Sequence, residues 1–317
     1  MNVPRGREDV AKLFENCISK DKLAQAYIIN APKGMGKKTV LNYILSLMLC
    51  STHDSCGECL SCKSLQAGAH PDVAELKREP DKATLGVGRV RDIKNEVYTR
   101  PVMSDYKAVV VYEAHLATAE AQNAMLKMIE EPPQKVVFFL LCDTLAPILP
   151  TILSRTVTVN LNPLPNTVLK EISGADDFQV SLCEGNPGRL IQLMEDADYT
   201  SLRDEIIDAF SSLATGGAYA PYDIASRFDK IKEGKDEILD VMLLFARDVY
   251  YKKKGMESSV INKDKMNYIN SFADKLDETS AWRIMNNIID TQREKGKNGN
   301  FNMALTILLL KCLKEFK

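Results

Sequence analysis

The sequence predicts a protein of three domains: an α/β domain with a parallel sheet of the P-loop type at residues 1–162, a small helical lid domain at 163–200 and an all-helical domain at 201–317. Short apolar runs alternate with amphipathic helical stretches in the first domain, as expected of parallel strands joined by crossover helices. A glycine-rich turn follows the first apolar run. Beyond about residue 200, the apolar patterns have the period of a helix.

The elements of the α/β domain are predicted from the periods of their apolar residues. Two runs, Ala108 to Tyr112 and Val136 to Leu141, are continuously apolar, which is typical of strands buried on both faces. The Pro132-Pro133 pair ends the helix before the second run. The expected helices span residues 7–23, 40–49, 87–98, 117–130 and 148–153, and the expected strands span 26–29, 70–76, 108–112, 136–141 and 157–161.

The helical domains begin after Asn162-Pro163-Leu164-Pro165, where the alternation of strands and helices stops. The small domain ends near Gly185-Asn186-Pro187-Gly188-Arg189. In the last domain, two apolar stripes recur at helical spacing and predict the core of a helical bundle. The stripes consist of Ile238, Met242, Phe245 and Val249, and of Phe301, Leu305, Leu308, Cys312 and Phe316.

Composition limits the class of protein. The 317 residues are 45% hydrophobic, which is enough for the cores of two or three domains. A net charge of −2 gives no overall basic signature, so any nucleic-acid contact would have to be a local patch. No apolar run reaches the roughly 18 residues of a membrane span, and the first residues lack the apolar core of a signal peptide. We therefore expect a cytoplasmic protein without membrane contact.

The stretch from Ile28 to Thr39 is a modified phosphate-binding loop. An apolar strand leads into a glycine-rich turn and then into an apolar helix, which turns backbone N–H groups toward an anion. The full pattern is G-x-x-x-x-G-K-[ST], in which the lysine reaches the outer phosphates and the hydroxyl holds Mg²⁺. Here Ala31 replaces the first glycine and Lys38 replaces the hydroxyl residue. The candidate cofactor-binding residues of this degenerate loop are Gly34, Gly36 and Lys37.

A second departure from the P-loop pattern follows the apolar run at 108–112. In P-loop enzymes an Asp after such a strand helps to hold Mg²⁺, and a Glu beside it can polarise the attacking water. Here Tyr112 stands at the Asp position and Glu113 follows it. Both protein groups expected on the metal are therefore absent, and Lys38 places a cation where the ion would sit. The sequence predicts that this chain does not bind ATP or does not hydrolyse it.

Four cysteines lie close together after the P-loop helix, with the spacing C-x₅-C-x₂-C-x₂-C. Four thiolates in such a short stretch predict a closed, structural tetrahedral Zn²⁺ site, and scattered reduced thiols are the alternative. The candidate ligands are Cys50, Cys56, Cys59 and Cys62, with His53 as a substitute if Cys50 is buried in the helix end. Cys17, Cys142, Cys183 and Cys312 lie in apolar periods and are expected in the core.

Arg155 lies between a short helix and the last expected strand. An arginine at such an exposed end can be an arginine finger, which acts on the nucleotide of a neighbouring subunit and contributes roughly 10³–10⁵ in rate. A surface salt bridge explains the same position, and the spacing alone does not separate the two. Basic residues around the helix at 87–98 can contact a DNA backbone, although a solvated helix face explains them equally well. They are Arg89, Arg91, Lys94 and Arg100.

Several longer motifs together resemble one family. Leu23-Ala24-Gln25-Ala26-Tyr27, His70-Pro71-Asp72, the stretch from Gln122 to Pro133 and the stretch from Leu149 to Arg155 are similar to the clamp-loader branch of the AAA+ ATPases. The resemblance covers at least residues 8–200. The four-cysteine insert narrows it to bacterial clamp loaders, those of DNA polymerase III. That family has ATP-hydrolysing tau/gamma subunits and non-hydrolysing delta-prime subunits. The altered loop resembles the delta-prime type more closely.

The resemblance implies roles for several residues. Arg155, in the family's Ser-Arg-Cys motif with Thr156 in place of Cys, would reach the ATP of an adjacent motor subunit. Asp143 and Thr144 stand where the family senses the γ-phosphate, and Arg189 matches the second sensor of its lid domain. The last domain resembles the collar that holds five subunits in a ring.

The resemblance also implies partners. The chain would be a scaffold in a hetero-pentamer with tau/gamma and delta subunits, and would meet the sliding clamp and primer–template DNA through that complex. One alternative is an ATP-hydrolysing tau/gamma-type motor, in which Lys37 and Glu113 still act and Thr39 reaches Mg²⁺. Another is a stand-alone zinc-dependent nucleic-acid-binding module, against which the net charge of −2 argues.

Overall fold

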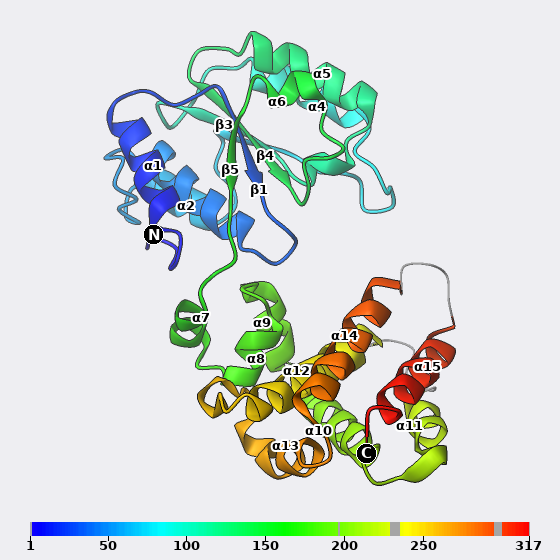
Figure 1. Cartoon of the computed structure of the whole chain (residues 1–317). Coiled ribbons are helices and arrows are strands. Elements are labelled where there is room, and N and C mark those ends of the chain that lie inside the picture. Colours follow the sequence, from blue (N-terminus) through cyan, green and yellow to red (C-terminus); the bar gives the residue numbers. More distant parts are fainter. Residues whose placement is uncertain (1, 196, 229–234, 295–299, 317) are drawn as a thin grey trace. The chain divides into compact units, whose positions relative to one another are not determined.

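The computed structural model describes residues 2–195, 197–228, 235–294 and 300–316, and Figure 1 shows its elements. The chain separates into two compact units, one formed by residues 1–174 with 185–189 and the other by residues 175–184 with 190–317. The chain therefore passes between the units three times within a short stretch. The three-domain division expected from the sequence stays a prediction.

The first unit is built on a parallel sheet of five strands in the order β2-β3-β4-β1-β5. Ala26 of β1 lies opposite Phe138 of β4, and Tyr27 lies opposite Val157 of β5. All residues of β3 and β4 are buried, which confirms the prediction from their continuously apolar runs. The strands are β1 (Ala26–Asn30), β2 (Val73–Leu76), β3 (Lys107–Val111), β4 (Val136–Cys142) and β5 (Val157–Asn160).

Helices cover both faces of this sheet (Figure 1). One apolar core packs α1 and α2 against the sheet through residues such as Phe14 and Ile44, and a second packs α4, α5 and α6 against the other face. Each expected helix is present, although the one expected at 40–49 begins earlier, directly after the turn at Gly36. The helices are α1 (Glu8–Ser19), α2 (Lys37–Leu49), α3 (Leu60–Gln66), α4 (Val87–Val97), α5 (Ala119–Glu130), α6 (Pro150–Leu153) and α7 (Asn166–Ser173), with a 3₁₀ turn at Ala114–Leu116.

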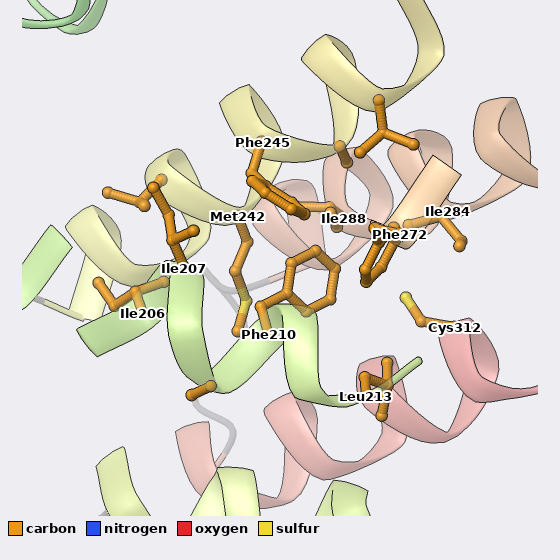
Figure 2. Packing of buried hydrophobic residues seen from close by; sticks show 14 of the residues in the cluster. Ile206, Ile207, Phe210, Leu213, Met242, Phe245, Phe272, Ile284, Ile288 and Cys312 are labelled. Atoms are coloured by element: carbon orange, nitrogen blue, oxygen red, sulfur yellow. The ribbon is translucent and has the colours of Figure 1, made fainter. Parts of the chain in front are cut away.

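Helices joined by short turns and one irregular segment build the second unit, with no strand among its described residues. The rings of Phe210, Phe245 and Phe272 meet at its centre with centroids 5.3–6.0 Å apart (Figure 2). The two predicted stripes lie in this core, with Phe301 and Phe316 packed at its margin. The helices are α8 (Asp177–Leu182), α9 (Pro187–Glu195), α10 (Ala197–Ser212), α11 (Ala220–Phe228), α12 (Lys235–Lys253), α13 (Met266–Ala273), α14 (Glu278–Glu294) and α15 (Phe301–Leu313), with 3₁₀ turns at Gly217–Tyr219, Glu257–Ser259 and Lys263–Lys265. The first residues of α9, up to Arg189, belong to the first unit.

A polar network lies beside this core. The guanidinium of Arg203 donates to both carboxylate oxygens of Asp264 at 2.7 Å and to Asn262 Oδ1 at 2.8 Å. It also lies over the Phe178 ring, 4.1 Å from the centroid. The fully buried Asp248 accepts hydrogen bonds from the Asn262 amide and side chain. The network therefore fixes the irregular segment between α12 and α13, in addition to the packing of Val260 in the core.

Candidate functional site

The predicted P-loop opens onto a cavity at the carboxyl ends of four adjacent strands. Ligands of open parallel sheets bind at this edge, because loops from neighbouring strands converge there. The order β2-β3-β4-β1 brings together residues that follow each of these strands. The cavity has a volume of about 550 Å³ and is lined by Lys33, Gly34, Gly36, Lys37, Lys38, Lys77, Arg78, Pro80, Tyr112, Glu113, Leu141 and Asp143. Five of these side chains are cations and two are carboxylates, so the cavity favours anions.

The turn from Ala31 to Gly36 keeps the backbone shape of a phosphate-binding loop. Gly34 and Gly36 have φ values of +89° and +82°, a region that residues with a Cβ rarely adopt. Gly36 is also the N-cap of α2, so the loop leads directly into the helix N-terminus. The structure thus places all three candidate cofactor-binding residues, Gly34, Gly36 and Lys37, on one cavity wall.

The Lys37 ammonium group donates hydrogen bonds to three acceptors of the protein itself. It donates to Asp143 Oδ1 at 2.6 Å, to the Pro32 carbonyl at 3.0 Å and to the Ala31 carbonyl. A lysine has three N–H donors, so these three acceptors match its full capacity. A phosphate that used Lys37 would have to displace at least one of them.

The two residues that replace the expected magnesium ligands face each other. The Lys38 ammonium lies 5.3 Å from the centroid of the Tyr112 ring, and the Lys77 ammonium lies 4.8 Å from it. The Tyr112 hydroxyl donates to Glu75 Oε1 at 2.7 Å. Burial and this carboxylate raise the pKa of Tyr112, so its hydroxyl stays neutral at physiological pH. A neutral phenol and an ammonium are poor ligands for a hard divalent cation.

Glu113, the candidate water-polarising residue, is held by an ion pair. Its carboxylate accepts from Arg78 Nε at 2.8 Å, and Arg78 Nη1 donates to the Lys82 carbonyl at 2.8 Å. Glu113 also has a left-handed backbone with φ of +48°, at the sharp turn that follows β3. The alternative motor mechanism would need Glu113 to orient a water instead of pairing with Arg78. It would also need Thr39, which is exposed one position beyond Lys38 on α2.

Asp143 follows β4 and lies between the side chains of Lys37 and His115. Besides pairing with Lys37, its carboxylate lies 3.7 Å from His115 Nε2, and its amide donates to His115 Nδ1 at 3.2 Å. The Thr144 hydroxyl accepts from the Ala146 amide at 3.4 Å, within its own turn. Asp143 therefore lies where the resemblance expects a phosphate sensor, with its carboxylate used by Lys37.

Arg155 follows α6 and is partly exposed. Its Nε donates to Glu130 Oε1 of α5 at 2.9 Å, and its Nη1 donates to the Thr151 carbonyl at 3.1 Å. The surface salt bridge considered from the sequence is therefore present. An exposed pair of this kind contributes about 0–1 kcal/mol to stability, so the Arg155 guanidinium can leave Glu130 at little cost in free energy.

The four predicted cysteine ligands come together between α2 and α3. Their sulfur atoms all lie within 4.8 Å of one another, with Cys50 to Cys56 at 3.6 Å and Cys56 to Cys62 at 4.0 Å. Tetrahedral coordination at the usual Zn–S distance of about 2.3 Å requires sulfurs about 3.8 Å apart. The cluster has this size, so the four cysteines can bind a structural metal ion.

The backbone around the cysteines is shaped as a metal knuckle. The Cys59 amide donates to Cys56 Sγ and the Cys62 amide donates to Cys59 Sγ, both at 3.4 Å. Gly57 provides the turn between them with φ of +75°. Cys50 joins the cluster although it is buried, and His53 Nδ1 instead contacts the Leu47 carbonyl at 3.2 Å. The substitute ligand is therefore not needed.

The remaining cysteines agree mostly with their predicted place in the core. Cys142, Cys183 and Cys312 are buried, whereas Cys17 is only partly buried, which corrects its expected core position. Cys17 lies near the end of α1, whose apolar face is carried by Phe14 and Ile18 instead. All eight cysteines of the chain are free thiols.

Sequence reasoning missed a buried polar cluster that holds the cysteine segment to the sheet. The His70 Nε2 atom hydrogen-bonds Ser61 of α3 and lies 3.3 Å from the Ser104 hydroxyl. Asp72 is fully buried, and its carboxylate accepts from the amides of Val102, Met103 and Ser104 at 2.6–2.8 Å. The His70-Pro71-Asp72 motif carried a signal, but the sequence did not tell which loop it binds.

The candidate DNA-contacting residues lie on or near α4. Arg91 and Lys94 are exposed and line a second cavity of about 500 Å³ between α4 and α5, together with Lys127 and Tyr98. Arg89 is paired with Asp92 at 3.4 Å on the same helix. Basic side chains thus gather on this surface.

Within the described part of the chain, no helix is both long and apolar enough to cross a bilayer.

Comparison with known proteins gives consistent family matches. A family model described as DNA polymerase III, delta subunit, matches residues 6–165, and a model described as its C-terminal part matches residues 197–316. The delta-prime subunit of Bacillus subtilis is 24% identical over 95% of this chain and 94% of its own length. The delta-prime subunit of Escherichia coli is 32% identical over 62% of each chain.

A tau subunit and a solved structure are also similar to this chain. The tau subunit of Bacillus subtilis is 26% identical over 67% of this chain, which is 34% of tau. A crystal structure of a gamma-subunit-related DNA polymerase III protein from Thermotoga maritima covers 98% of this chain and 99% of its own, at 18% identity and a TM-score of 0.44.

The sheet order and the P-loop after β1 define an α/β domain of the AAA+ class. The two matched family models together cover most of the sequence. The chain belongs to the DNA polymerase III delta-prime family of clamp-loader subunits.

Proposed function

We propose that this chain acts in a clamp loader as a delta-prime subunit that does not hydrolyse ATP and acts on the ATP of its neighbour. The observation that carries this proposal is the pairing of Lys38 with Tyr112 at the expected metal position. Phosphoryl transfer in P-loop proteins depends on an ion held by the loop hydroxyl and the strand carboxylate. This chain has a cation and a phenol there, so its own cavity lacks both protein ligands.

Arg155 is proposed to act in trans as an arginine finger. It stands on the surface after α6, and its pair with Glu130 is exposed on both sides. A triphosphate carries more negative charge than one surface carboxylate, and it can also accept two parallel hydrogen bonds from a guanidinium. A neighbouring ATP can therefore replace Glu130 at little cost in free energy, given the small contribution of surface pairs.

The partners proposed for the chain follow from its family. They are tau/gamma and delta subunits in a hetero-pentamer, and the sliding clamp and primer–template DNA reached through that complex. The helical second unit, with its core around Phe245, would serve as the collar. A cytoplasmic place of action is part of the same proposal.

Zinc is the proposed metal of the four-cysteine cluster. Four thiolates with no other donor form the ligand set that structural zinc prefers, and the sulfur spacing fits it. Bound zinc would supply a structural cross-link and no catalysis, because four cysteines leave no open position. Cys50 at the end of α2 and Cys62 in α3 would be held together in this way.

A reconstituted complex tests the finger. We expect Arg155→Ala to leave assembly unchanged and to lower the ATPase rate at least about tenfold. Arg293→Ala is the matched control, because Arg293 is also an exposed arginine in an ion pair and lies on α14. An unchanged rate in Arg155→Ala would reject the trans role.

The isolated chain tests the lack of hydrolysis. We expect no Mg²⁺-dependent ATP turnover by the chain alone. Turnover that Lys37→Ala abolishes would instead support the tau/gamma-type motor.

A further inference from the structure

The backbone carbonyls of the P-loop are all used by hydrogen-bond donors of the protein. The Lys37 ammonium binds the carbonyls of Ala31 and Pro32. The Val40 amide binds the Gly36 carbonyl at 3.0 Å, as the first bond of α2. The three carbonyls between them accept from residues far away in the sequence.

These three donors come from two other segments of the same unit. The Asn186 side chain donates its Nδ2–H to the Lys33 carbonyl at 2.8 Å, and the Gly188 amide donates to the Gly34 carbonyl at 2.9 Å. The Met35 carbonyl accepts from Arg7 Nη2 at 3.1 Å, and the Arg7 side chain is buried. The donors lie between 28 and 154 residues from their acceptors in the sequence, so the contacts are tertiary and not part of a local turn.

Asn186 makes two kinds of contact with one side chain. Its Oδ1 accepts from the amides of Gly188 and Arg189 at 3.1 Å, which caps the start of α9. Its Nδ2 faces the opposite way and reaches Lys33. The same residue therefore begins α9 and attaches that helix start to the loop.

The two backbones touch at a pair of glycines. A Cβ added to Gly188 would lie 2.6 Å from Gly34 Cα and 2.8 Å from the Gly34 carbonyl oxygen. A Cβ added to Gly34 would lie 2.4 Å from Asn186 Oδ1. Both distances are far below van der Waals contact, so this approach requires glycine on each side. Gly34 thus has a packing role in addition to its left-handed backbone.

We infer that the P-loop of this chain is a docking site for the chain's own segments, namely Gly185–Arg189 and Arg7. In this role the loop is ordered through its carbonyl groups by protein donors and does not need a phosphate to fix its shape. Asn186 and Gly188 are positioning residues of this contact. The inference goes beyond the proposed function and does not depend on whether Arg155 acts in trans.

The test separates docking from helix capping. Asn186→Asp keeps the cap oxygen and the size of the side chain but replaces the donor to Lys33 with an acceptor. Gly188→Ala places a methyl group against Gly34. Gly88→Ala in α4 is the control, because a Cβ there meets no atom within 4 Å. The readout is amide hydrogen exchange of residues 31–39 in the full chain without nucleotide.

We expect exchange in residues 31–39 to become at least about fivefold faster in Asn186→Asp and in Gly188→Ala, as for the loss of one hydrogen bond. The control should match the original chain. Exchange that stays within about twofold in Asn186→Asp would overturn the inference. An increase in Gly88→Ala as large as that in Gly188→Ala would also overturn it. The isosteric Asp variant decides the question if the alanine variant fails to fold.

Discussion

The ammonium group of Lys38 lies 5.3 Å from the centroid of the Tyr112 ring. One residue follows the P-loop lysine and the other follows β3, so the two replacements at the expected metal position meet in space although they are far apart in the sequence. A cation over an aromatic face contributes about 0.5–1 kcal/mol at an exposed site and more when desolvated. The replacements therefore stabilise each other.

This pairing predicts that Mg²⁺-dependent ATP binding returns only when both positions carry the usual P-loop residues. We expect Lys38→Thr with Tyr112→Asp to bind ATP at least about tenfold more tightly in Mg²⁺ than without it, measured by titration calorimetry. Each single change should give no such difference, because Lys38 alone repels the ion and Tyr112 alone leaves it without a carboxylate. Tight Mg²⁺-dependent binding by the unchanged chain would contradict the prediction.

The ion pair between Arg155 and Glu130 predicts that Glu130 and a neighbouring ATP compete for the Arg155 guanidinium. If Glu130 only holds the guanidinium until a neighbouring ATP is present, Glu130→Gln should leave the ATPase rate of the complex equal or higher. The free energy of unfolding should change by less than about 1 kcal/mol, as for a surface ion pair. A fall in rate to the level of Arg155→Ala would show that Glu130 is needed to position Arg155.

The cysteine cluster predicts one metal ion per chain. We expect metal analysis of fresh protein to give about one equivalent of zinc and less than about half an equivalent in Cys56→Ser. Cys17→Ser is the control, because Cys17 lies outside the cluster. Chelation should also lower the melting temperature of the original chain, since the ion would link α2 to α3. Equal zinc in both variants would exclude these four ligands.

Asp72 is predicted to be a large contributor to stability. Its buried carboxylate accepts three backbone amides of residues 102–104, and hydrogen bonds to a charged group contribute about 1.5–3 kcal/mol each. Asp72→Asn keeps the shape but turns an acceptor into a donor, so we expect a loss of roughly 3 kcal/mol in denaturant unfolding. Asp81→Asn, at an exposed position, should have no measurable effect. Equal stability of the two variants would contradict this role.

Asp264 predicts a pH dependence in the helical unit. Hydrogen bonds and charge from Arg203 hold the pKa of Asp264 below its usual value of 3.8. The stabilisation is therefore fully present above that value and is lost as the pH falls through the lower folded pKa. The melting temperature of Asp264→Asn should lie below that of the original chain by a constant amount from pH 7 to about 5, and the difference should shrink below pH 4. A difference that grows on acidification would have the wrong sign.

Most of the secondary structure was predictable because it is encoded locally. Each expected strand is present, including β3 and β4, whose continuous apolar runs need no knowledge of their neighbours. The short helix α3 was not predicted, since seven residues that include Ser61 and Cys62 carry too weak a period. The expected strand at 70–76 was too long because the polar contacts of His70 and Asp72 precede the pleated part.

The site was predictable in its residue types and less so in its contacts. The spacing of the four cysteines predicted their convergence, because a short segment limits how far the ligands can separate. The partner of Arg155 was not predictable, since Glu130 comes from a helix that precedes β4. A spacing of 25 residues between Glu130 and Arg155 gives no hint of an ion pair unless the order of the strands is known.

The sequence by itself determined which strands and helices follow one another along the chain, the loss of both magnesium ligands and the four-cysteine spacing. Each of these is a property of one continuous segment. Only the tertiary structure decided that Lys38 meets Tyr112, that Glu130 holds Arg155, and that Arg7, Asn186 and Gly188 bind the carbonyls of the P-loop. These contacts depend on the strand order β2-β3-β4-β1-β5 and on where the chain returns to the sheet, and apolar periodicity encodes neither.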